Sequence, residues 1–297
     1  MSPRDIALAV FVVSMWGLGF TVLKPTMAQF PPILIMAVSF TATALLLMAF
    51  ERRRPATGHL AAACIALFAV SGQAALIFTA LSGLEASTGV IIAQFQVPLA
   101  VLWAWLLRTE PFQPSKLVAF VIALCGVMII AGLPADRPAP GFVALMIAGG
   151  AVWGLGQALI AKLGRDDGAV LLKRVALHGA AQLILFTLLF EDGQWTALTT
   201  GSPAAWAGLA FIALVAFALA YVIWFDLMRR NPVSQVTPFV MLMPAVSVVA
   251  SSAPVCGDAA KVRGAAAMVR VVQVSPSVVL RRVPSKPTTL VGPEVRA

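Results

Sequence analysis

The four residues Trp16-Gly17-Leu18-Gly19 recur as Trp153-Gly154-Leu155-Gly156, 137 positions later in a chain of 297 residues. A looser echo follows: Gln94-Phe95-Gln96-Val97-Pro98 holds the place in the first half that Val240-Met241-Leu242-Met243-Pro244 holds in the second, at an offset of 146. Two matches in the same order indicate duplication, with the extra residues of the second half inserted around 191–203. Two similar halves in an apolar chain are typical of a transporter built from repeats.

The composition excludes a water-soluble protein. Hydrophobic residues make up 60% of the chain, charged residues 11%, and the mean hydropathy is +0.94. A soluble domain carries about 25% charged residues. The net charge of +9 would suggest nucleic acid for a soluble chain, but these cations fall in short loops between apolar stretches. We therefore predict an all-α integral membrane protein that contacts the lipid bilayer and binds no nucleic acid.

Long uncharged stretches predict nine membrane spans, because a helix needs about 20 residues to cross the hydrocarbon core. These spans are 5–24, 32–50, 60–82, 86–107, 116–133, 141–163, 172–190, 204–228 and 233–253. Five spans in the first half is an odd number, so the second half begins on the opposite side of the membrane. The prediction is two inverted repeats, 5–133 and 141–253, around a central cavity, an arrangement that suits alternating access.

The loop charges predict the orientation. Twelve Lys and Arg residues lie in the N-terminus and the loops on its side, whereas only Lys24 and Arg137 lie in the opposite loops. Since loops rich in Lys and Arg stay in the cytoplasm, we expect a cytoplasmic N-terminus in a multi-pass protein.

Residues 254–297 do not fit the repeat. Five helices in the second half would require a tenth span, but the longest uncharged run after Asp258 is Val271–Leu280, which is too short to cross. The tenth helix is therefore missing or degenerate. We favour the hypothesis that the reading frame is lost or the gene rearranged near residues 250–257. The alternative is a genuine disordered tail, because this basic segment contains many prolines and few aromatic residues.

The chain offers little for catalysis or for metal binding. The ionisable residues Lys24, Glu85, Glu110 and Asp226 all lie at span ends, so no coupling ion is indicated. The three cysteines have no metal-binding spacing. His59 and His178 lack a second ligand nearby and are interpreted as structural or loop residues. We predict no enzyme activity, no cofactor and no metal.

Aromatic and amide side chains at mid-membrane positions are the candidates for a substrate cavity, because an amide facing lipid is costly. They are Trp16, Phe20, Gln73, Phe78, Gln94, Phe95, Trp153, Gln157, Tyr221 and Trp224, with Gln96 beside them. Gln94 and Gln96 cannot share a helical face, since two residues turn the helix by about 200°. One is expected in the cavity and the other between helices. The structural alternatives are interhelical hydrogen bonds for the glutamines and packing for the tryptophans.

Prolines and glycines at matching places are candidates for bends or gates. Pro98 and Pro244 each free a carbonyl inside a span and bend the helix. The glycines of the repeated motif, Gly17, Gly19, Gly154 and Gly156, allow helices to approach closely. A purely structural kink is the alternative for the prolines.

Together these stretches resemble the EamA-type branch of the drug/metabolite transporter superfamily over about residues 5–250. The matching residues are Trp16-Gly-Leu-Gly-Phe20 before Lys24, Pro31-Pro32, and Tyr221 to Pro244, which contains Asn-Pro-Val-Ser-Gln-Val-Thr-Pro-Phe. The resemblance implies ten helices in two inverted repeats and export of small metabolites, often amino acids, from the bacterial inner membrane. The chain departs from the family pattern at Ser39-Phe40, where an Arg-Phe pair is usual, and at Arg108-Thr109-Glu110, where Gly-Glu-Arg is usual.

The leading functional prediction is a secondary transporter that exports a small-molecule substrate such as an amino acid or derivative. The alternatives are a multidrug or cationic-compound exporter, which would favour a membrane carboxylate, and a truncated, inactive family member. The sequence also allows a homodimer.

Overall fold

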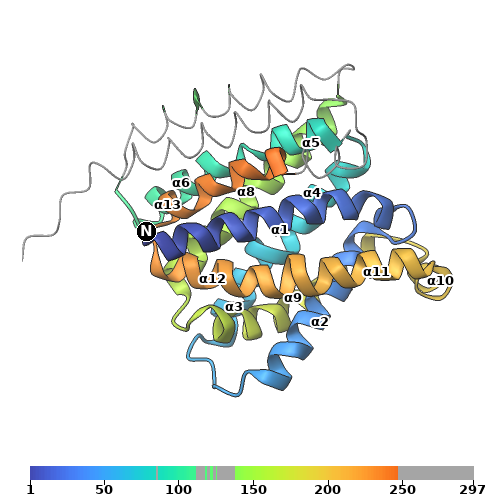
Figure 1. Cartoon of the computed structure of the whole chain (residues 1–297), viewed down its shortest axis with the longest axis horizontal. Helices are drawn as coiled ribbons and strands as arrows, with labels where there is room; N and C mark the ends of the chain where they lie inside the picture. Colours follow the sequence, from blue (N-terminus) through green and yellow to red (C-terminus); the bar gives the residue numbers. More distant parts are fainter. Residues whose placement is uncertain (85, 112–117, 119–120, 123–124, 126–137, 247–297) are drawn as a thin grey trace, which may run out of the picture.

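The structure, a computed structural model, describes residues 1–84, 86–111, 118, 121–122, 125 and 138–246. All regular elements in this part of the chain are helices, arranged as a bundle (Figure 1). Those long and apolar enough to cross a membrane are α1 (Pro3–Met27), α2 (Pro32–Phe50), α3–η1–α4 (His59–Ser82), α8 (Pro140–Leu163), α9 (Gly168–Phe190) and α11–η2–α12 (Pro203–Arg230). The predicted all-helical, multi-pass class is confirmed.

Within the described residues, two shorter apolar helices also belong to the bundle. Ile91–Leu106 joins α5 (Ala86–Ala93) to α6 (Gln96–Leu106), and Val233–Val246 includes α13 (Val233–Val236) and η3 (Thr237–Leu242). Most of the fifth predicted span, 116–133, and the whole segment 254–297 lie outside the described residues. The count of nine spans therefore stays a prediction. The loop where the sequence indicated an insertion contains the short helix α10 (Gln194–Thr200).

The helix that contains η1 and the helix that contains η2 are interrupted at corresponding places. Leu67–Ser71 (η1) and Ile212–Leu219 (η2) are wider π-helical turns within otherwise α-helical spans. Their first residues lie 145 positions apart, close to the offset of the repeated sequence stretches. π turns are rare and often mark functional sites, and the sequence patterns did not predict them.

The two prolines interrupt their helices by the same mechanism. Proline has no N–H and cannot bond the carbonyl four residues earlier. At Pro98 that carbonyl belongs to Gln94, and it accepts from Val97 N–H at 3.1 Å instead. At Pro244 the carbonyl belongs to Val240, and Met243 N–H is its donor. The backbone forms a turn at Gln94–Phe95 and a 3-10 helix at Thr237–Leu242, so both helices depart from α geometry before their proline.

The first glycine of each repeated motif faces the proline-containing helix of the other half. A Cβ added to Gly17 in α1 would lie 2.8 Å from Val246 Cβ, and one added to Gly154 in α8 would lie 2.7 Å from Ala100 N. Real Cβ atoms do not approach that closely, so glycine is required at both positions if the helices are to pack as they do. Val246 and Ala100 are 146 positions apart.

The second glycine of each motif faces the π-helical segment of the other half. A Cβ added to Gly19 would lie 3.1 Å from Ala216 Cβ in η2, and one added to Gly156 would lie 2.5 Å from Ala69 N in η1. The four glycines lie inside the continuous helices α1 and α8. They are therefore close-packing positions between the halves.

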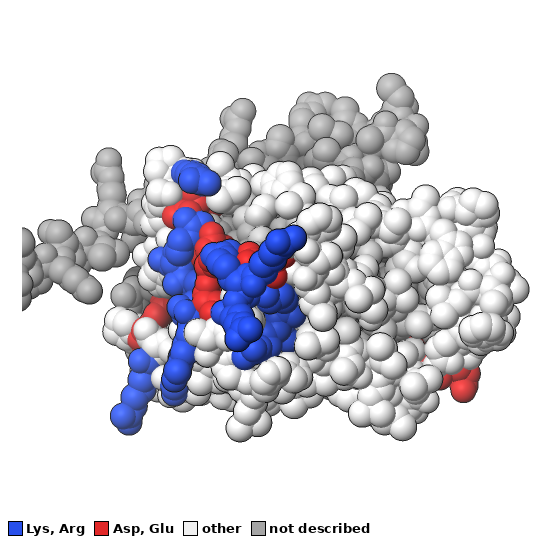
Figure 2. Space-filling model, turned by 90° about the horizontal axis from the view of Figure 1, so that it is seen from below, with Lys and Arg blue, Asp and Glu red and all other residues white. Residues whose placement is uncertain are grey.

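Charged side chains gather at one end of the bundle, the left end in Figures 1 and 2. There the loop at 51–58 is held against the start of α9: Arg53 pairs with Glu51 at 2.7 Å and with Asp167. Hydrogen bonds from Arg53 lower the pKa of Glu51 to about 2. We call this end, which carries Arg4, Arg52, Arg53, Arg54, Arg165, Arg229 and Arg230, the basic end.

At the opposite end of the bundle, a carboxylate caps the N-terminus of α2. The N-cap residue of α2 is Pro31, whose side chain cannot accept a hydrogen bond. The carboxylate of Glu191, just after α9, accepts instead from Ile33 N at 2.7 Å and from Leu34 N at 2.9 Å. A helix N-terminus favours negative charge, and this contact fixes α2 against α9, along which it packs.

Candidate functional site: the central cavity

A cavity of about 110 Å³ lies between the helices of the two halves. A single water needs roughly 10–15 Å³ by the same measure, so the space suits a small molecule. Its lining is mostly apolar with a few polar side chains: Trp16, Gly19, Leu23, Met36, Gln73, Ile77, Phe78, Leu81, Gly89, Ala93, Gln94, Gln96, Met146, Trp153, Ile212, Ala216, Phe217, Tyr221, Val240 and Met243. This mixture is typical of ligand pockets.

An aromatic cluster forms one wall and the floor of the cavity. The ring of Trp16 lies 5.4 Å from that of Tyr221 and 4.8 Å from that of Trp224, whose ring is 6.1 Å from that of Trp153. Phe40 and Phe217 each lie 5.4 Å from Tyr221. Aromatic pairs in such tilted, edge-to-face and stacked arrangements contribute about 0.5–1.5 kcal/mol beyond their buried area. The cluster therefore fixes the shape of the wall.

Trp16 is held by the π turn opposite it. Its indole Nε1–H donates to Ala216 O at 2.9 Å in a buried position. Ala220 N–H, which closes the π segment, bonds the carbonyls of Val215 and Phe217 and passes over that of Ala216. A buried indole N–H needs an acceptor, and the altered turn supplies one on the facing helix.

A second indole bond closes the floor. Trp224 Nε1–H donates to Gln157 Oε1 at 2.7 Å, and Gln157 Nε2 lies 3.4 Å from Trp153 O. Both Gln157 and Trp224 are 1% exposed. Neither lines the cavity directly. They form the layer beneath it, on the side of the basic end.

Three glutamines border the cavity. Gln73 Nε2 donates to Val70 O at 3.2 Å within its own helix. The expectation that only one of Gln94 and Gln96 faces the cavity is wrong, because both line it. The 200° argument assumed a continuous helix, whereas the backbone turns at Gln94–Phe95.

Phe95 lies elsewhere. It is 39% exposed and absent from the cavity lining among the described residues, since the same turn directs it outward. Phe20 belongs to α1, but its side chain lies outside the described part of the structure. Phe78 and Tyr221 do line the cavity. Among the described residues no group bonds the Tyr221 hydroxyl, so this hydroxyl is free to bond a ligand in the cavity.

Sequence reasoning missed Met36, Ile77, Met146, Phe217, Val240 and Met243, which also line the cavity. Apolar residues at mid-span carry no pattern that separates a cavity wall from ordinary packing. Within the described residues, no group of three or more His, Cys, Asp or Glu side chains could hold a metal ion.

The expectation that neither histidine has a second potential ligand nearby is wrong. His59 Nδ1 lies 3.2 Å from His178 Nε2, and the rings meet edge to face. The two residues are 119 positions apart, and the sequence gives no sign that the start of α3 meets the middle of α9.

Long apolar helices around an internal cavity are the architecture of a multi-pass membrane protein with an internal binding space. The model of the EamA-like transporter family matches residues 4–132 and again residues 141–254, and the chain belongs to this family. The predicted family is thereby confirmed. One model matches twice, once in each half of the chain.

Several known proteins are similar. A "Probable amino-acid metabolite efflux pump" of Salmonella typhimurium is 28% identical over 87% of this chain and 89% of its own length. A protein of Escherichia coli with the same name is 24% identical over 85% and 87%. A solved crystal structure superposes with a TM-score of 0.77 at 17% identity, covering 96% of this chain and all of the other, which shows a shared fold.

Proposed function

We propose that the chain is a secondary transporter of the bacterial inner membrane that exports amino acids or their derivatives by alternating access. The observation that carries the proposal is the central cavity, which has aromatic and amide walls drawn from both halves and is closed by packed side chains toward the basic end. Transport requires such a binding space and a way to open it to either side.

The matched contacts support two inverted repeats. Gly17 and Gly154 meet the proline-containing helices of the opposite halves, and Gly19 and Gly156 meet the opposite π turns. An inverted pair of repeats places the binding site at their interface, near the bilayer midplane. The cavity lies between residues from both halves, where this arrangement would put a substrate.

The basic end supports a cytoplasmic N-terminus. Short loops rich in Lys and Arg remain in the cytoplasm, and Figure 2 shows these side chains gathered on one end. Leu23, Met36, Leu81 and Met146, which line the cavity, lie within a few residues of the helix ends opposite the basic end. In this orientation the cavity lies toward the outer side of the membrane.

Contacts between the halves close the cytoplasmic side. Arg230 at the end of α12 pairs with Asp5 in α1 at 3.2 Å and with Asp226 at 2.5 Å. The amino group of Met1 donates to Gln235 Oε1 at 3.2 Å. The Arg230–Asp5 pair and the Met1–Gln235 bond join the start of the first half to the second, so these two must break when the cavity opens to the cytoplasm.

The lining favours a substrate with an apolar body and polar groups. Aromatic faces of Trp16, Trp153 and Tyr221 would hold the body, while Gln73 and Gln94 would bond polar atoms. The names of the relatives point to amino-acid metabolites. The same aromatic faces would also attract organic cations, which keeps a multidrug or cationic-compound exporter as the second candidate.

The test is release of metabolites by cells that produce the protein. We expect one or more amino acids or derivatives to accumulate in the medium above vector controls. Gln73→Leu should abolish the release at normal membrane levels, whereas Gln29→Leu, at the surface opposite the basic end, should not. Unchanged media across a panel of amino acids, derivatives and organic cations would contradict transport. Export of cations alone would support the second candidate.

The tail has its own hypothesis and test. The alternative is that residues 254–297 follow a lost frame, and the chain would then be an inactive member of the family instead of an exporter. Resequencing codons 245–297 decides it: a corrected frame with an apolar tenth span would restore the repeat.

A further inference from the structure

A polar stripe on α9 crosses the interface with α3. Arg174, His178 and Gln182 are spaced four residues apart and therefore share a helical face. Arg174 Nη1 donates to Thr57 O at 2.5 Å. His178 contacts His59, and Gln182 Nε2 donates to Ala63 O at 3.1 Å. Each step of four residues advances about 6 Å along the helix, so the stripe runs from the basic end into the membrane.

The deepest member of the stripe bonds the π segment. Ser71 Oγ, in the last residue of η1, donates to Gln182 Oε1 at 2.5 Å. Gln73 follows two residues later and lines the central cavity. The stripe thus connects the histidine pair to the cavity through one hydrogen bond and one altered helical turn. π turns are rare and frequently lie at functional sites.

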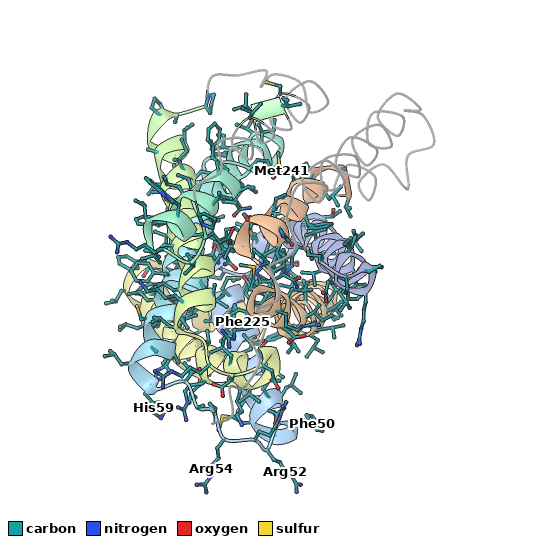
Figure 3. All side chains as sticks on the ribbon, turned by 90° about the vertical axis from the view of Figure 1, so that its left-hand side faces the viewer. Phe50, Arg52, Arg54, His59, Phe225 and Met241 are labelled. Atoms are coloured by element: carbon teal, nitrogen blue, oxygen red, sulfur yellow. The ribbon has the colours of Figure 1, made fainter. Side chains whose placement is uncertain are left out.

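We propose that His59 and His178 form a shared proton-binding site that sets how α3 packs on α9 and, through Ser71 and Gln182, the position of Gln73 in the cavity. The proton is the ligand. The site lies at the edge of the bundle near the basic end, where His59 is exposed (Figure 3).

The number of protons bound to the pair determines how strongly the two rings are hydrogen-bonded. When both rings are neutral, one N–H donates to the lone pair of the other ring nitrogen. A first added proton binds the outer nitrogen of the donating ring and strengthens the bond between the rings, because the donor is then charged. A second proton removes the last acceptor and leaves two cations 3.2 Å apart. The bond is lost, and α3 separates from α9 at that level.

The charged groups around the histidine pair also affect its protonation. Arg174 lies four residues before His178 on the same face of α9, and its positive charge opposes the second proton. Lys173 donates to Glu51 O at 2.8 Å and also to Arg53 O, and Arg53 pairs with Glu51 and Asp167. The carboxylate of Asp166 accepts from Thr57 N at 2.9 Å. These neighbours are engaged with one another, and histidine is the side-chain type on this face whose ordinary charge change falls between about pH 5 and 8.

The first measurement is the titration of both rings by nitrogen NMR of the full-length protein in lipid nanodiscs. Interacting sites titrate as a pair in two macroscopic steps. We expect the steps to lie more than about one pH unit apart, and His178→Gln to leave a single step for His59. Two independent single steps in the wild type would overturn the shared site.

The second measurement tests the link to the cavity and does not require transport. A cysteine replaces Gln73 in a chain whose native cysteines are changed to alanine, and its labelling rate with a maleimide is compared at pH 7.5 and pH 5.5. The matched control adds His59→Asn and His178→Gln, whose amides keep the hydrogen bond but cannot titrate. Because the thiol chemistry is common to both, the ratio of rates isolates the histidines.

We expect the pH ratio to differ about fivefold between the two backgrounds, the lower end of typical coupling between sites. Should Gln73→Cys fail to fold, Ile77→Cys, one turn further along the same cavity wall, takes its place. Equal ratios in both backgrounds would overturn the link. Failure of export in cells would contradict the proposed transport alone and leave this result standing.

Discussion

The bond between Trp224 and Gln157 under the cavity can be tested by a double-mutant cycle. Gln157→Leu removes the acceptor of a 2.7 Å bond between two side chains that are each 1% exposed. A buried N–H left without a partner costs about 1–3 kcal/mol. Trp224→Phe leaves the amide oxygen without its donor and should cost a similar amount, plus part of the ring contact with Trp16.

The double variant should lose clearly less unfolding free energy than the two single variants added together, because neither polar group is then left without a partner. Hydrogen bonds between membrane helices couple by about 0.6–2 kcal/mol, and we expect a coupling energy in that range. The measurement is the free energy of unfolding in bicelles by steric trapping. Trp195→Phe, at a position 78% exposed, is the control and should change little. Strictly additive single variants would refute the reasoning that this bond closes the floor.

Three further predictions follow from individual contacts. Gly156→Ala should destabilise the protein by about 1–3 kcal/mol through overpacking against η1, whereas Gly141→Ala, with open space around it, should be neutral; equal thermal stability of the two would count against the close approach. Glu191→Gln should lower the unfolding temperature, because it weakens the charged cap on α2, and an unchanged temperature would show the cap to be inert. Arg230→Ala should raise the fraction of molecules open at the basic end about fivefold, since a partly exposed ion pair contributes up to about 1 kcal/mol; spin-label distances across that end measure this, and Asp5→Asn should act in the same direction.

The predicted helices agree best where charge marks their ends. The predicted spans 32–50 and 141–163 correspond to the helices Pro32–Phe50 and Pro140–Leu163. For the first of them, Pro31-Pro32 and Glu51-Arg52 fix where the helix begins and ends. The span at 86–107 was drawn as one helix and is broken at Gln94–Phe95. Pro98 predicts a break in this helix. The directions in which Gln94 and Phe95 then face depend on which backbone carbonyl gains a new hydrogen-bond donor.

The types of side chain that line the cavity could be predicted from the sequence better than the individual residues that line it. Trp16, Gln73, Phe78, Trp153 and Tyr221 lie on the cavity wall, as their polar or aromatic character in an apolar span suggested. The histidine pair and the π turns were not predictable, because they depend on the register between α3 and α9 and on how each carbonyl is satisfied. Those are tertiary properties with no local sequence pattern.

The central claim is that substrate passes through this cavity, and filling the cavity tests it most directly. Ala93 lines the cavity, whereas Leu185 on α9 is 53% exposed on the outer face of the bundle. Purified protein in liposomes would be assayed for counterflow of labelled amino acids, comparing Ala93→Trp with Leu185→Trp. The account predicts counterflow for the wild type and for Leu185→Trp, and its loss for Ala93→Trp at unchanged thermal stability. Wild-type rates from Ala93→Trp would contradict it.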